Sequence, residues 1–486
     1  MTLAIIAVYM ALVLAVGALS HLLFRGTGED YFLATRSIGP FVLLMSLFGT
    51  QMTAFALLGA SGESYRTGIG VFGLMASSSA IVVPAVFFFI GTRAWAVGKR
   101  CGYTTQVQLI RDRWGSDALG LLLFVVLVAL LIPYLLIGVM GAGITLADIS
   151  GGSVPTWVGG LVITVVVMLY VTYGGLRGTA WANTFQTLVF MTLGAVTFVY
   201  VARSMGGLGA ALARIDDAYP DLLVRGDNFT AIKYVTYSFI PLSAGTFPHL
   251  FMHWLTAGKL RNFKTTVVAY PLCIAVVWVP SVLLGVLGKD TFPDLTVPQS
   301  NAVMVRMISA HAPEVLAGLL GAGVFAAVMS SLDSQTLSLS TMFTKDIVLH
   351  YGFHENMSDR QQILSGRLFV AAILTVTWLL SLVTRTSIFA MGTWAFTGFA
   401  GLLPVIVAAL YWRRSTKAGA FAAVITVTVL WTYYFAQGFG QPEYTVGGSG
   451  VMPVAVVVAA STVAMIVGSL LSTPPDAERL GRFFPS

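Results

Sequence analysis

The chain has 486 residues, of which 57% are hydrophobic and only 10% are charged. Soluble domains carry roughly 25% charged residues, so this composition excludes a water-soluble globule and predicts extensive contact with lipid. The net charge of +7 does not indicate nucleic-acid binding, because the basic residues form no patch and fall between apolar segments. Two distant cysteines, Cys101 and Cys273, indicate neither a disulfide framework nor a metal site.

Apolar runs long enough to cross a bilayer recur along the whole chain. A helix that spans the bilayer needs about 20 apolar residues. By this length, the sequence predicts one all-α membrane domain with about 13 spans. The first run has no basic region before it and no small-residue cleavage site after it, which predicts a retained helix and not a signal peptide. The predicted spans are 3–24, 38–60, 70–97, 117–146, 157–175, 183–203, 232–256, 265–287, 310–344, 367–384, 388–411, 418–437 and 451–472.

The distribution of lysine and arginine predicts the orientation in a plasma (cytoplasmic) membrane. With the N-terminus outside, 19 of the 27 basic residues fall on the cytoplasmic side and 27 minus 19, or 8, on the other. The positive-inside rule favours this arrangement, with the C-terminus in the cytoplasm. The eight residues predicted outside are Arg66, Arg203, Arg214, Arg225, Lys233, Lys289, Arg306 and Arg385.

Two spans are interrupted. The second contains Gly49-Thr50-Gln51 in its middle, and the seventh contains Pro241, Gly245 and Pro248 within eight residues. Interrupted helices in corresponding positions of two halves indicate a transporter binding site, since freed backbone groups can coordinate an ion or solute in a cavity. We therefore predict two inverted repeats of five helices, 38–203 and 232–411, flanked by peripheral helices at 3–24 and 418–472.

The ninth span carries a polar stripe. Ala327, Ser330, Ser331 and Ser334 recur at spacings of three and four, so they share one helix face. Hydroxyls and backbone carbonyls are hard oxygen ligands, and a neutral cage of them favours a monovalent cation such as sodium. Serines in membrane helices also bond to the preceding turn or join helices together, so the stripe alone leaves both interpretations open. Asp333, a carboxylate inside the span, favours a functional site within reach of the same cavity.

Three stretches resemble one transporter family. They are 30–40, entering the second span; 173–186, with Tyr173-Gly174-Gly175 and Trp181-Ala182-Asn183; and 326–335, followed by Phe343-Thr344-Lys345-Asp346. The chain is similar over nearly its whole length to the sodium:solute symporter family, which has the inverted-repeat fold of the LeuT type. The resemblance implies a sodium ion, as the coupling ion, between the broken first core helix and the eighth. Its ligands here would be the carbonyls of Gly49, Met52 and Ala327 and the hydroxyls of Ser330 and Ser331.

The sequence departs from the family pattern at three places. Asn183 stands where members often have an acid that helps to hold a second sodium, so Asp333, with Ser334 and Asn183, is the candidate for a second ion or for coupling. Gln51 stands where proline-transporting members place an acid. Ala80, Pro241 and Ala244 replace residues that sugar-transporting members use, which argues against a sugar.

The expected cargo is a small monocarboxylate, an amino acid such as proline, or a pantothenate-like acid. Few charges lie in the predicted core, so recognition would rest on helix N-termini, which favour a carboxylate, and on neutral polar groups. His249 and His253, one helical turn apart, favour packing over proton sensing. The candidate substrate-binding residues are Thr50, Gln51, Thr53, Ser243, Thr246 and Phe247.

Other functions remain open at this stage. A proton-coupled transporter of the same fold, using Asp333, is one alternative, and a channel or a sensor derived from the fold is another. An enzyme is not expected, because His249 and His253 have no acid partner nearby in sequence. The sequence gives neither the ion stoichiometry nor the oligomeric state.

Overall fold

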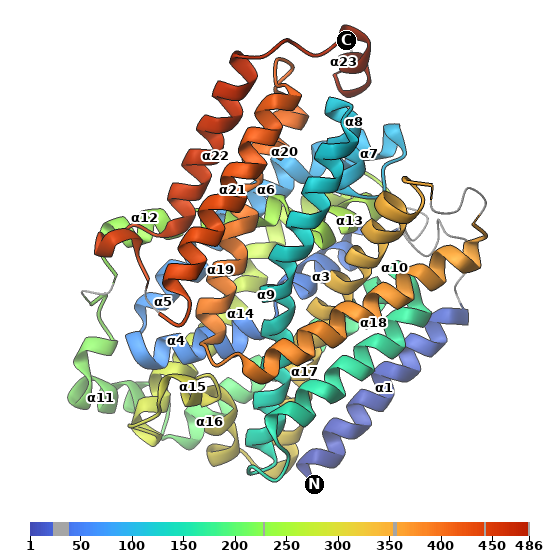
Figure 1. Cartoon of the computed structure of the whole chain (residues 1–486). Helices are drawn as coiled ribbons and strands as arrows, with labels where there is room; N and C mark the ends of the chain where they lie inside the picture. Colours follow the sequence, from blue (N-terminus) through green and yellow to red (C-terminus); the bar gives the residue numbers. More distant parts are fainter. Residues whose placement is uncertain (23–37, 227–228, 353–356, 442–443, 485–486) are drawn as a thin grey trace.

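The protein is a bundle of membrane-length helices, seen in a computed structural model that describes residues 1–22, 38–226, 229–352, 357–441 and 444–484 (Figure 1). The side chains of 16–22, 172–178 and 477–479 are outside the described set. Within these ranges the structure contains helices and one isolated bridge, between Ile38 and Ala257. The N-terminus and the short C-terminal helix lie at opposite ends of the bundle, which we call the N-terminal and C-terminal sides.

The first half of the chain contains two long helices, α9 and α10, and several shorter segments. A run from Gly70 to Cys101 is continuous but contains two π-helical turns. The elements are α1 (Thr2–Leu22), α3 (Pro40–Gln51), a π turn (Phe55–Gly59), α4 (Ala60–Thr67), α5 (Gly70–Phe72), a π turn (Gly73–Ser77), α6 (Ser78–Val86), a π turn (Phe87–Gly91), α7 (Thr92–Cys101), α8 (Gln106–Trp114), α9 (Asp117–Ile149), α10 (Thr156–Ser204) and α11 (Leu208–Ala218).

The second half begins with short pieces and continues with long helices. The elements are a 3-10 turn (Pro220–Leu222), α12 (Ala231–Tyr237), a 3-10 turn (Ile240–Gly245), α13 (Pro248–Thr256), α14 (Asn262–Thr291), α15 (Val297–Ser300), α16 (Val303–His311), α17 (Glu314–Met342), a π turn (Phe343–Val348), α18 (Asp359–Val383), α19 (Ile388–Gly401), α20 (Leu403–Tyr411), α21 (Lys417–Gly438), a 3-10 turn (Val446–Gly448), α22 (Pro453–Leu470) and α23 (Ala477–Phe483).

Membrane-length helices match the predicted spans in type, but the count of 13 is not confirmed. In the described part of the chain, nine helices are long and apolar enough to cross a membrane, or ten with the bent second span. Two predicted spans, 157–175 and 183–203, lie in the single helical element α10. The end of the first predicted span and residues 30–37 of the first motif lie outside the described residues.

Both interrupted spans are broken in the structure. The axis turns by 60° between α3 and the helix that starts at Phe55, so the break falls at 52–54, just after the predicted Gly49-Thr50-Gln51. The other span divides into α12, the 3-10 turn and α13. Proline explains the second division, since Pro241 and Pro248 each start a new helical segment and lack an amide hydrogen. Figure 1 places α3, α13 and α17 together inside the bundle.

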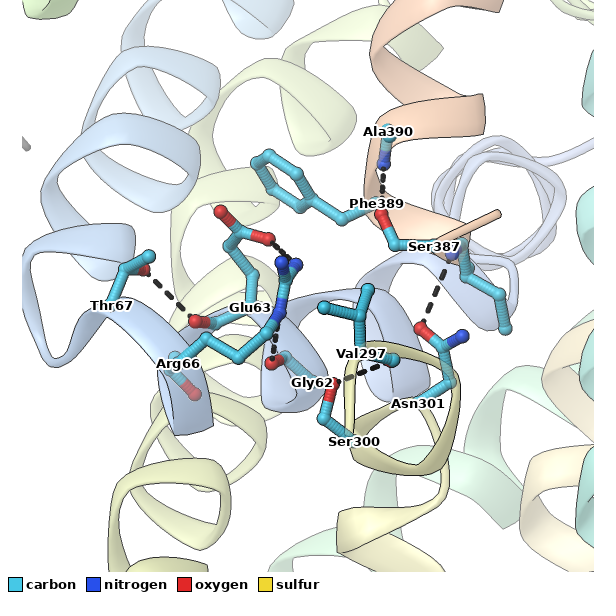
Figure 2. Close-up of polar contacts among 12 residues, drawn as sticks. Gly62, Glu63, Arg66, Thr67, Val297, Ser300, Asn301, Ser387, Phe389 and Ala390 are labelled. Atoms are coloured by element: carbon cyan, nitrogen blue, oxygen red, sulfur yellow. Dashed lines mark hydrogen bonds and ion pairs between the residues drawn. The ribbon is translucent and has the colours of Figure 1, made fainter. Parts of the chain in front are cut away.

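On the N-terminal side of the bundle, a short hairpin, α15–α16, covers the breaks. Figure 2 shows its contact with α4 at Gly62 and with the start of α19, where Asn301 Oδ1 accepts from the amide of Ile388 at 3.3 Å. A Cβ on Gly62 would lie 2.9 Å from the carbonyl oxygen of Ser300, so only glycine allows this approach. The Glu63–Arg66 ion pair lies beside it on α4 (Figure 2). The hairpin and α4 therefore pack backbone against backbone.

Aromatic rings fill the space between this closure and the first break. Phe389, at the start of α19, stacks on Phe55 with ring centroids 5.4 Å apart, and Phe55 meets Phe396 edge-on at 4.9 Å. A small cavity of about 30 Å³ is lined by Phe389, Glu63 and Tyr237, among other residues. The rings therefore separate the break from the N-terminal side.

Candidate sodium and solute site

The end of α3 is held against α10 by a close helix contact. A Cβ on Gly49 would lie 1.9 Å from Oγ1 of Thr187, a position that no side chain can occupy. Thr187 is anchored there because its hydroxyl donates to the carbonyl of Met45 at 3.0 Å. Beyond Gln51 the backbone turns extended at Met52, with φ −86° and ψ 98°. The last carbonyls of α3 thereby lose their helical partners and become available to other groups.

Ser330 joins α17 to this broken end. Its hydroxyl lies 2.8 Å from the carbonyl oxygen of Gly49 and 3.0 Å from that of Ala327, and it can donate to either. Three of the five predicted sodium ligands therefore meet at one point between α3 and α17. Met52 is buried at the break itself. Ser331 is buried on α17, but its hydroxyl accepts a hydrogen bond from the side-chain amide of Gln335 at 2.6 Å.

Asp333 lies one step around α17 and faces α10. One carboxylate oxygen accepts from the hydroxyl of Tyr170 at 2.8 Å, and the other from Ser334 at 3.0 Å. With its amide nitrogen turned toward this carboxylate, Asn183 donates to its two oxygens at 3.0 and 3.2 Å. Its amide oxygen lies 2.8 Å from the hydroxyl of Ser334, whose one proton can go either to it or to Asp333. No lysine or arginine of the described chain pairs with Asp333. A fully buried carboxylate with neutral partners alone attracts a cation or a proton.

The same amide connects the Asp333 cluster to the predicted sodium site. In this orientation Asn183 also donates to the carbonyl oxygen of Ser330 at 3.3 Å. On the other side, Ser334 is 3.1 Å from Nε2 of His253, whose Nδ1 is 3.0 Å from the hydroxyl of Ser46 on α3. The three predicted second-site residues, Asp333, Ser334 and Asn183, therefore form one hydrogen-bonded cluster, and His253 ties it to α3 and α13.

Tyrosines that the sequence analysis did not select surround the first break. The amide oxygen of Gln51 accepts a hydrogen bond from the hydroxyl of Tyr270, on α14. Its backbone carbonyl accepts from Tyr134, on α9, at 3.4 Å. Tyr134 also packs against Phe247 and Phe396, with ring centroids 5.2 and 5.0 Å away. Its ring therefore lies between the two broken spans. The only sequence signal for Tyr134 is a hydroxyl inside an otherwise apolar span.

The three predicted substrate residues of the second break, Ser243, Thr246 and Phe247, have three different environments. The hydroxyl of Thr246 donates to the carbonyl of Phe399 at 2.6 Å and is directed at backbone. The carbonyl of Thr246 accepts from the amide of Gln106 at 3.0 Å, which ties the break to α8. Ser243 is buried in the 3-10 turn. Phe247 meets Phe399 edge-on, with ring centroids 4.8 Å apart, and its ring also packs against that of Tyr134 beside the first break.

Buried polar groups without partners cluster at the two breaks. In the described part of the chain, the hydroxyls of Thr50 and Thr53 and both ring nitrogens of His249 make no hydrogen bond, although all three residues are at most 1% exposed. His249 lies at the start of α13, with its ring 5.1 Å from that of Phe247 and 5.7 Å from that of Tyr134. Buried polar atoms normally find partners, so this cluster is suited to a polar solute.

Comparisons with known proteins identify the family of the chain. A family model for the sodium:solute symporter family matches residues 31–426. The high-affinity proline transporter PutP of Bacillus subtilis (strain 168) is 24% identical over 83% of this chain and 86% of its own length. The sodium/pantothenate symporter of Escherichia coli (strain K12) is 26% identical over 84% of this chain and 85% of its own.

Solved structures give the fold. A Na+-coupled sialic acid symporter in a substrate-bound outward-open state superposes with a TM-score of 0.80 at 16% identity, covering 98% of each chain. This likeness confirms the predicted LeuT-type architecture with its broken helices. These relatives are named as transporters and symporters. The extent of the family match and the shared fold together place this chain in the sodium:solute symporter family.

Proposed function

We propose that this protein carries a small monocarboxylate, an amino acid such as proline or a pantothenate-like acid, together with sodium by alternating access. The observation that carries the proposal is the set of unpartnered donors at the two breaks: Thr50, Thr53 and His249. No acidic side chain is bonded to them, and the helical segments at Phe55 and Pro248 begin there, with their partial positive charge. The relatives named for proline and pantothenate handle solutes that carry one carboxylate.

The ion site that we propose consists of the carbonyls of Gly49, Met52 and Ala327 and the hydroxyls of Ser330 and Ser331. The contacts of Ser330 with Gly49 and Ala327 support it, because they bring neutral oxygens from two helices to one point. Sodium there would fix α3 against α17 and order the break beside it. Coupling is then reciprocal: the factor by which sodium tightens solute binding is the factor by which solute tightens sodium binding.

The residues proposed to contact the solute are Thr50, Gln51, Thr53, Ser243, Thr246 and Phe247, joined by Tyr134 and His249. Thr246 would act through the second lone pair of its carbonyl oxygen, which also accepts from Gln106, since its hydroxyl is bonded to Phe399. Tyr134 would contact the solute and the carbonyl of Gln51 together, which links cargo recognition to the α3 end of the sodium site.

The membrane arrangement in the proposal follows the charge distribution. The N-terminal side faces outside and the C-terminal side faces the cytoplasm, across the plasma membrane. The repeats are 38–203 and 232–411, with α3 and the α12–α13 region as their broken first helices. Movement of these elements against the rest of the bundle would open the closed N-terminal side and expose the breaks.

Uptake into proteoliposomes tests this function. With an inward sodium gradient, we expect labelled proline or pantothenate to accumulate above its external concentration, and no accumulation with potassium in place of sodium. Pyrrolidine, which lacks the carboxylate of proline, should not compete with proline. Accumulation driven equally by a proton gradient without sodium would instead favour the proton-coupled alternative. Solute flux that only runs down its own concentration gradient would indicate a channel. Solute binding without any flux would indicate a sensor.

We further propose that Asp333, Ser334 and Asn183 form a second cation site. We expect Asp333→Asn to lower the number of sodium ions moved per solute from two to one, because the amide keeps the size of the side chain and one acceptor oxygen but removes the charge. The measurement is the ratio of labelled sodium to labelled solute entering proteoliposomes. Unchanged stoichiometry and unchanged sodium dependence in this variant would contradict the proposal. The control is Asp290→Asn, at the end of α14, where the carboxylate pairs with Arg214 of α11 away from the breaks.

A further inference from the structure

A large cavity opens on the N-terminal side, away from the breaks. Its volume is about 740 Å³. One wall consists of the hairpin α15–α16 and the other of α9, the start of α10 and the end of α18. The hairpin wall also packs on α4, through the contact at Gly62. An occupant would therefore touch both the element that closes the N-terminal side and the helices behind it.

The cavity is apolar toward the membrane. Val139, Met140 and Ile144 on α9 form its inner surface, and Leu382 of α18 forms its rim. The rim continues into a lipid-exposed face of α18, where Leu382 and Val383 are 44% and 75% exposed. Acyl chains fit such a surface, since the same face is already in contact with hydrocarbon.

Groups that prefer the membrane–water boundary surround the mouth. Trp157 is half exposed, and its carbonyl accepts from the indole of Trp378 at 3.1 Å. Tryptophans at this level mark the headgroup region. Arg306 is neutralised by Asp148 at 2.8 Å, whereas Arg385 is exposed and makes no ion pair or hydrogen bond with any described residue. The lining therefore carries one surplus positive charge.

We propose that this cavity binds an anionic glycerophospholipid, with its phosphate at Arg385 and its acyl chains along α9 and α18. Asn301, which is buried and has its oxygen bonded to the start of α19, lines the cavity and offers its amide nitrogen as a second donor. Bound there, the lipid braces the α15–α16 hairpin in its packed position on α4. The composition of the membrane would then bias the closure of the N-terminal side.

Native mass spectrometry of the purified full chain tests the site, with phosphatidylglycerol and phosphatidylcholine as probes. We expect one phosphatidylglycerol to be retained in preference to phosphatidylcholine. Arg385→Gln should weaken its binding about fivefold, as expected for one basic residue at a membrane surface. Arg385→Lys should preserve binding, and Arg203→Gln, on an exposed arginine outside the cavity, should leave it unchanged. Ile144→Trp should weaken binding by filling the cavity without a change of charge.

Three outcomes would overturn the inference. Equal phosphatidylglycerol binding by Arg385→Gln and the unaltered protein would remove the headgroup contact. An equal loss in Arg203→Gln would indicate a general charge effect. Displacement of the lipid by glycerol 3-phosphate at similar concentration would show a site for a free anion. A melting curve for each variant separates loss of lipid from loss of fold, and lipid binding is independent of the identity of the transported solute.

Discussion

Ser330→Ala should raise the sodium concentration needed for half-maximal uptake by about 10- to 100-fold, because it removes the hydroxyl that meets both Gly49 and Ala327. A polar contact with a charged group contributes about 1.5–3 kcal/mol, which corresponds to that range. Initial rates of solute uptake against sodium concentration measure the effect. The rate at saturating sodium should recover most of its original value, since the backbone ligands remain.

Two comparisons separate ion binding from folding. Ser338→Ala removes a hydroxyl of the same helix that bonds only to the preceding turn, at Gln335, and should leave sodium activation unchanged. Ser331→Ala should act in the same direction as Ser330→Ala, with a smaller effect, since the hydroxyl of Ser331 is partly engaged by Gln335. Normal sodium activation in both Ser330→Ala and Ser331→Ala would remove the serines from the ion site.

Gly49→Ala should nearly abolish transport. Its Cβ would overlap Oγ1 of Thr187 at 1.9 Å, so α3 must move away from α10 and carry the carbonyl of Gly49 with it. Overpacking of this kind costs about 1–3 kcal/mol and displaces a proposed sodium ligand as well. We expect an uptake rate at least about tenfold lower at physiological sodium, with the loss again largest at low sodium.

A compensating change makes this prediction specific. Thr187→Ala removes the clashing oxygen, so the double variant should recover transport that the single Gly49→Ala variant has lost, as a double-mutant cycle would reveal. Gly73→Ala is the matched control, because a Cβ there meets no atom within 4 Å. Full activity of Gly49→Ala would show that α3 and α10 do not approach as closely as described. Failure of Thr187→Ala to rescue would place the damage elsewhere.

Hydrophobic length predicted most of the fold. The runs at 117–146 and 388–411 lie in α9 and in α19–α20, because a bilayer-spanning helix is recognisable from one segment alone. The break lies at 52–54, directly after the predicted Gly49-Thr50-Gln51. No glycine or proline stands at 52–54; the carbonyl of Gln51 meets Tyr134 from another helix, and such distant partners cannot be read from local sequence.

The candidate sites were predictable to different extents. The spacing of Ser330 from Ala327 placed both on one stripe, and the structure shows them bonded. Asp333 was expected to share the cavity of Ser330. Three residues along a helix place it about 60° around the axis, where it bonds to Tyr170 on α10 and is linked through Asn183 to the carbonyl of Ser330. The contacts of Tyr134 and Tyr270 with Gln51 were not predicted, because an isolated hydroxyl in an apolar run carries no periodic signal.

The two acceptors of Ser330 have a consequence for the release of sodium. A hydroxyl has one proton, and the carbonyls of Gly49 and Ala327 compete for it. When sodium occupies these oxygens, the proton must turn away from at least one of them, so the ion displaces an internal hydrogen bond worth about 1 kcal/mol. Affinity is lowered by about fivefold as a result. When sodium leaves, the hydrogen bond of Ser330 to the carbonyl of Gly49 can form again and hold α17 against α3 without the ion. This recovered bond favours release of sodium on the side of the membrane where its concentration is low.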